Sequence, residues 1–128
     1  PEASSPQVNF SQQAHVLLTA FFKAARQAMA NASTGGYYQL ESLTRIATAV
    51  AKLRQAPAIE MPDVVLAINL NEESRAAKGL HSVLNYQVLP NDKPNTSLMQ
   101  GSFAKAMIKL SERVFTFCTS HGTIRAEE

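Results

Sequence analysis

The sequence has a single cysteine, Cys118, among its 128 residues. One thiol cannot form an internal disulfide, so nothing points to an oxidising compartment and a cytoplasmic setting is expected. Long apolar runs are also missing. The longest, such as VVLAI at residues 64–68, are far too short to cross a bilayer, and no signal peptide opens the chain. We therefore expect no contact with a membrane.

The excess of positive over negative charge is also small. The sequence contains twelve Lys and Arg residues and ten Asp and Glu residues, for a formal net charge of +2. This excess is far below that of a dedicated nucleic-acid binder, so any electrostatic function requires local clustering of charge. Hydrophobic residues make up 45% and charged residues 17%, the balance of a soluble globular domain. The length is that of one domain.

The motifs of nucleotide and metal sites are absent from the sequence. It contains no Walker loop and no Gly-x-Gly-x-x-Gly stretch, and its one Gly-Gly pair lies between two predicted helices. The three histidines, His15, His81 and His121, are far apart, and only Cys118 and His121 stand at helical spacing. Two ligands do not make a metal site, so we expect no metal and no cofactor.

Carboxylates that could act as a catalytic pair are also lacking. Glu72 and Glu73 are consecutive, so on a helix they project about 100° apart and cannot both face one substrate. We interpret them as residues that begin a helix. Cys118 with His121 could form a nucleophile pair, but no acidic residue is placed to orient the histidine. The sequence therefore predicts a protein that is not an enzyme.

Apolar residues at spacings of three and four predict the first two helices. The first should begin at Asn9 or Ser11 and run to about Ala32, before the glycines of STGG at residues 33–36. Its apolar face is broad, which suits a central helix or a subunit interface. The second should span residues 37–56 and end before Pro57. The short link between them predicts an antiparallel αα-hairpin.

The next segment gives a mixed pattern. Pro62 and Asp63 suit the first turn of a helix, but the residues from Asn69 to Asn71 interrupt the apolar spacing. Asn71 reads as a new helix start, which predicts two short helices or one kinked helix. Residues 88–95 should form a loop. The last helix should begin near residue 96 and end at Gly122.

No stretch alternates apolar and polar residues for long, and no repeat of 20 to 50 residues is present. The prediction is an all-α, single-domain bundle of four to five helices, largely antiparallel. Residues 1–8 are expected to be a flexible lead-in, residues 9–121 the helical bundle, and residues 122–128 a tail.

Three cations stand four residues apart in KAMIKLSER, residues 105–113. On a helix, Lys105, Lys109 and Arg113 fall within an arc of about 80°, opposite the apolar stripe around Met107. They form either a ridge for phosphates or an acidic partner, or a solvated helix face. Glu112 dilutes their charge and no aromatic residue is interleaved, which favours the solvated face.

The remaining candidates lie in the second helix. Arg45 and Lys52 form a smaller cationic counterpart, and Tyr37 and Tyr38 stand at the start of this helix as aromatic residues of a kind common at interfaces. Equally, these tyrosines would serve to cover an end of the bundle.

From these features we predict a helical protein–protein interaction module for adaptor or assembly roles, with another protein or a second copy as its partner. The candidate partner-binding residues are Lys105, Lys109, Arg113, Arg45, Lys52, Tyr37 and Tyr38. The alternative is a nucleic-acid-associated accessory domain that uses the basic ridge of the last helix, with affinity that falls steeply as salt rises.

Overall fold

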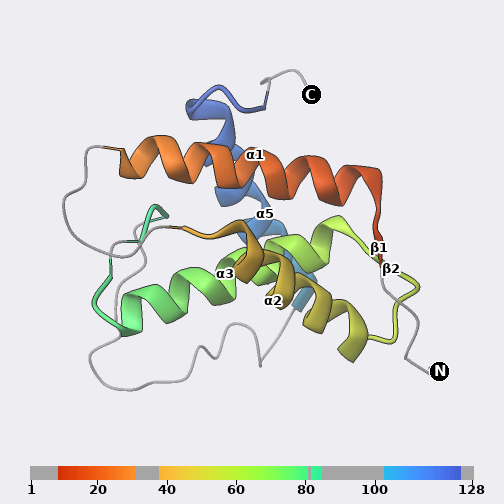
Figure 1. Ribbon diagram of the computed structural model, residues 1–128. Coiled ribbons are helices and arrows are strands. Elements are labelled where there is room, and N and C mark those ends of the chain that lie inside the picture. The colour runs from red at the N-terminus through yellow and green to blue at the C-terminus, as the bar shows by residue number, and fades with distance from the viewer. Residues whose placement is uncertain (1–8, 31–37, 81, 85–102, 125–128) are drawn as a thin grey trace.

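The computed structural model describes residues 9–30, 38–80, 82–84 and 103–124. Within them lie four helices, α1 (Gln12–Met29), α2 (Leu40–Leu53), α3 (Met61–Ala77) and α5 (Phe103–Ser120), and two short strands, β1 (Asn9–Phe10) and β2 (Ala58–Ile59). In Figure 1, α2 runs opposite to α1 and to α3, while α5 crosses behind them. The predicted all-α bundle is confirmed, with a minor two-stranded parallel sheet added to it.

Helix α1 is the central element that its broad apolar face predicts. The Ser11 hydroxyl caps it by accepting a hydrogen bond of 3.1 Å from the backbone N–H of Ala14. One face is closed to solvent along the whole helix, with Leu17 and Phe21 at most 1% exposed and Met29 5% exposed. It packs against α2, α3 and α5, so a single core lies between the four helices.

The two strands tie the start of α1 to the connection between α2 and α3. Asn9 pairs with Ala58 and Phe10 with Ile59 in parallel register, and the Ser11 N–H donates to the Ile59 carbonyl at 2.9 Å. Two residues a strand are too few to show an alternating pattern, which is why the sequence did not indicate them. The pairing places the starts of α1 and α3 beside each other (Figure 1).

Helix α2 ends three residues earlier than expected, at Leu53. Gln55 takes a positive φ of 58°, which turns the chain out of the helix before Pro57. The α2–α3 connection is therefore short and the two helices pack closely along their length.

Helix α3 corrects the sequence prediction, because it is one helix from Met61 to Ala77. Asn71 does not begin a new helix, and Glu72 does not act as a residue of a first turn. Asn69 is 2% exposed and its side-chain amide donates to the Glu73 carboxyl one turn later, at 3.4 Å. Asn69, which interrupts the apolar spacing in the sequence, is thus buried with a hydrogen-bond partner on the same helix, and the helix continues through it.

Helix α5 has the predicted buried stripe in its described part. Met107, Leu110 and Phe117 pack against the core, and Val114 and Cys118 are buried in it. Gly122, with a φ of 75°, ends the helix as predicted. The expected lead-in, the loop at residues 88–95 and the expected helix start near residue 96 lie outside the described residues, as does the end of the tail.

Candidate interaction surfaces

The cations of α2 lie on its outer face. Arg45 and Lys52 are both exposed and are seven residues, or two turns, apart. The Arg45 guanidinium donates to the Glu41 carboxyl at 2.8 Å, and both side chains are largely exposed. An exposed pair of this kind contributes little to stability, so it leaves both charges accessible to a partner. Leu53, at the end of α2, is 85% exposed.

On α5, Lys105, Lys109 and Arg113 are all exposed, together with Glu112. Arg113 also has an internal role, since its guanidinium donates a hydrogen bond to the backbone carbonyl of Leu84. A charge-assisted hydrogen bond of this type fixes the segment at residues 82–84 against α5. The row of three cations is therefore part solvated face and part structural contact.

Of the two candidate tyrosines, only Tyr38 lies within the described residues, and it is buried. Tyr37 lies outside the described residues. Tyr38 is 2% exposed, and its ring meets that of Phe21 edge to face at 6.0 Å between centroids. The Arg75 guanidinium lies 4.0 Å from the centroid of the Tyr38 ring. Tyr38 therefore belongs to the interior, and predicting it as a surface contact was wrong because the hydroxyl finds its partners inside.

Those partners form a buried polar cluster around Glu72, which is 0% exposed. Its carboxyl accepts hydrogen bonds from the hydroxyls of Tyr38 and Ser82 and, at 3.0 Å, from the N–H of Leu84. The Tyr38 hydroxyl accepts in turn from the N–H of Val83 at 3.1 Å. Burial, reinforced by the Glu72 carboxyl, raises the pKa of the Tyr38 hydroxyl well above its ordinary value.

Leu84 thus links the side chains of two different helices. Its N–H donates to Glu72 of α3, and its carbonyl accepts from Arg113 of α5. The cluster holds the short segment at residues 82–84 between these helices. Sequence reasoning missed it because Tyr38, Glu72 and Ser82 share no local pattern and meet only through the fold.

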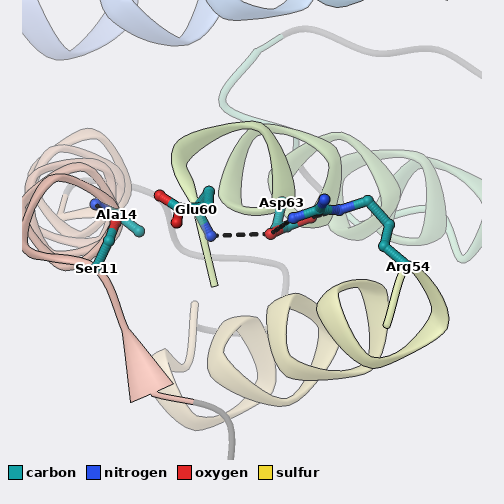
Figure 2. Close-up of polar contacts among 5 residues, drawn as sticks. All are labelled: Ser11, Ala14, Arg54, Glu60 and Asp63. Carbon is teal, nitrogen blue, oxygen red and sulfur yellow. Dashed lines mark hydrogen bonds and ion pairs between the residues drawn. The ribbon is translucent and has the colours of Figure 1, made fainter. Parts of the chain in front are cut away.

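A second polar contact joins α2 to α3 (Figure 2). Arg54, which follows the last residue of α2, makes a bidentate pair with the Asp63 carboxyl at 2.7 and 2.6 Å. The Asp63 carboxyl also accepts from the N–H of Glu60 at 2.9 Å, which satisfies a free donor at the start of α3. Asp63 was correctly expected at this helix start, but its partner Arg54 was not.

The ionisation of Asp63 follows from these contacts. Burial alone would raise the pKa of its carboxyl, since the side chain is 1% exposed. The hydrogen bonds from Arg54 and from the Glu60 N–H, with the positive charge of Arg54, outweigh burial and hold the pKa below its ordinary value. The pair is therefore a charged connection between α2 and α3.

Cys118 and His121 do not form a reactive pair. The Cys118 side chain is 0% exposed, and burial raises the pKa of its thiol to about 11, which keeps it protonated near neutral pH. The His121 ring instead packs on Phe117 at 4.5 Å between centroids. Among the residues that the structure describes, no group of three or more His, Cys, Asp or Glu residues could hold a metal ion.

Packing and polar contacts together define a small helical domain with a closed interior and charged outer faces. Residues 3–75, more than half of the chain, match the MCM AAA-lid domain, and the chain belongs to that family. The match covers β1, α1, α2, β2 and nearly all of α3, and leaves α5 outside it. Searches of curated proteins and of solved structures give no significant match.

The family corrects one prediction. The sequence predicted a protein that is not an enzyme, and this is wrong, because the MCM AAA-lid domain is part of an ATPase helicase. The sequence indicated otherwise because it contains no Walker loop. A lid domain carries no nucleotide-binding motif of its own, so the spacing of residues in this sequence could not indicate an ATPase.

None of the helices in the described ranges is long and apolar enough to cross a membrane.

Proposed function

We propose that the chain works as the helical lid of an MCM-type ATPase assembly and contacts a neighbouring subunit through the outer face of α2. The observation that carries this proposal is the family match over residues 3–75, which includes α2 in full. Lid domains of this family mediate contacts between subunits of the hexamer. The sequence predicted an adaptor or assembly module, and a lid that contacts a neighbouring subunit is a specific case of that role.

The outer face of α2 has suitable chemistry for such a contact. Glu41, Arg45 and Lys52 fall within about 40° of one another around the helix, and all three are exposed. Leu53 adds an aliphatic side chain that is 85% exposed at the end of the same helix. A charged stripe steers and orients a partner, while an exposed apolar side chain at its end gains free energy when a partner covers it.

The proposal is tested by titrating the labelled chain with recombinant MCM-family ATPase subunits and following fluorescence anisotropy. We expect at least one subunit to bind, and the variant Arg45→Glu/Lys52→Glu/Leu53→Asp to bind about tenfold or more weakly. Val16→Asp is the matched control, because Val16 is 54% exposed and belongs to a different helix, α1. Absence of binding to every subunit, or equal binding by the α2 variant, contradicts the proposal.

Nucleic-acid binding through the cations stays a prediction. Among the cations of the predicted ridge, Arg113 already donates a hydrogen bond to the Leu84 carbonyl and so serves a contact within the domain. The cytoplasmic setting expected from the single cysteine also stays a prediction.

A further inference from the structure

Helix α5 places few side chains in the core. Among the α5 residues whose exposure is described, only Val114 and Cys118 are buried, at 1% and 0% exposed. Helix α1, which has the same length, buries eight residues. Helix α5 also lies outside residues 3–75, the part of the chain that matches the family, and packs against α1 and α3 of that part. Its hold on the domain therefore depends more on other contacts.

The segment at residues 82–84, called the latch below, joins α5 to α3 by hydrogen bonds on both of its sides. On the α3 side, the Glu72 carboxyl accepts from the Ser82 hydroxyl and, at 3.0 Å, from the Leu84 N–H. On the α5 side, the Leu84 carbonyl accepts from the Arg113 guanidinium. All three residues of the latch are at most 8% exposed. The latch thus connects α5 to the buried carboxyl of α3 through one residue, Leu84.

The other three helices are tied together without α5. The Tyr38 hydroxyl, just before α2, donates to Glu72 of α3, and the pair of Arg54 with Asp63 joins α2 to α3 a second time. The two strands tie the start of α1 to the connection between α2 and α3. If the latch leaves, water can replace its donors at the Glu72 carboxyl, so breaking these bonds costs only their small net contribution.

We propose that the latch and α5 detach together as one unit while α1, α2 and α3 stay folded. Opening breaks the hydrogen bonds of the latch and separates the rings of Phe21 and Phe117, whose centroids lie 5.5 Å apart. It uncovers the apolar face that α1 and α3 turn toward α5, so the latch controls access to that face. Parts of a protein with few buried apolar side chains open in this way, below the free energy of global unfolding. The proposal does not rest on the subunit contact proposed for α2.

Cys118 reports this opening, because its thiol is the only one in the chain and is buried on α5. The test measures how fast the native chain reacts with a thiol reagent at increasing urea, where reclosing is faster than labelling, beside global unfolding followed by far-UV circular dichroism. We expect Cys118 to react about tenfold or more faster than global unfolding allows. Its rate should also depend less on urea, because the opening of α5 exposes less surface than global unfolding.

Variants on each side of the latch test its role. Arg113→Ala removes the donor on α5, and Ser82→Ala removes one donor to Glu72 on the α3 side. Each should raise the labelling rate of Cys118 about three- to tenfold. Lys109→Ala is the matched control, an exposed cation on the same helix, and should change the rate about twofold or less.

Hydrogen exchange shows which helices open together with Cys118. In Arg113→Ala the amides of α5 should exchange faster, while those of α1, α2 and α3 should exchange as in the native chain. Three results overturn the proposal. The first is labelling of Cys118 with the rate and urea dependence of global unfolding. The second is equal labelling rates for Arg113→Ala and Lys109→Ala. The third is faster exchange in all four helices of Arg113→Ala, which assigns Arg113 to the stability of the whole domain.

Discussion

The buried carboxyl of Glu72 is the point at which a single substitution should destabilise the domain most. Replacing it by alanine leaves three donors without their acceptor, the hydroxyls of Tyr38 and Ser82 and the N–H of Leu84. Each buried donor left unsatisfied costs about 1–3 kcal/mol. A water molecule that enters the vacated space restores part of this, so we expect a loss of about 3–6 kcal/mol.

That loss is a large share of the roughly 5–15 kcal/mol that stabilises a domain of this size. Glu72→Gln keeps the shape and one acceptor oxygen, so it should lose only about 1–3 kcal/mol. The assay is urea unfolding followed by far-UV circular dichroism, with the midpoint and slope compared between variants. A loss below about 1 kcal/mol for Glu72→Ala would refute the reasoning.

The double variant Glu72→Gln/Tyr38→Phe separates the pairwise contact from other effects. Tyr38→Phe removes the hydroxyl that donates to Glu72 and accepts from Val83. If the two side chains act through this hydrogen bond, the combined loss should differ from the sum of the single losses by about 0.5 kcal/mol or more. Strict additivity would show that the contact is not energetically important.

Three further predictions follow from the other polar contacts. Asp63→Asn should destabilise the domain by about 1–2 kcal/mol at pH 7, because its partner Arg54 is half exposed. Since the folded-state pKa of Asp63 is lowered, this difference should persist above about pH 5 and disappear as the pH falls below about 4, which pH-dependent urea titrations would reveal. Arg113→Ala should cost about 0.5–1.5 kcal/mol and Lys109→Ala less than about 0.5, and equal losses would remove the structural role given to Arg113. Cys118 should react with a thiol reagent at pH 8 only as fast as the domain opens, and rapid labelling of the native chain would contradict its burial.

The sequence predicted helices well where local signals and core packing agree. Ser11 is the helix cap that its position indicated, and the apolar faces of α1 and α5 are the buried ones. These features depend on residues three or four apart, which periodicity detects. Gly122 ends α5 with a positive φ for the same kind of local reason.

Prediction failed where polar residues are satisfied by distant partners. Glu72 was interpreted as a helix start because nothing local showed that Tyr38, 34 positions earlier, would donate to it. Tyr38 was named as a candidate partner-binding residue for the same reason. Contacts of this kind join residues that are far apart in the sequence, so the pattern of neighbouring residues does not indicate them.

The measurement that tests the central claim most directly places a photocrosslinking amino acid at position 53 of the chain, at the end of α2, and at position 16 as the control. Both side chains are strongly exposed, at 85% and 54%. In the presence of MCM-family ATPase subunits, we predict crosslinks from position 53 and none from position 16. Crosslinks from position 16 alone, or none from either position, would contradict the account of α2 as a subunit contact.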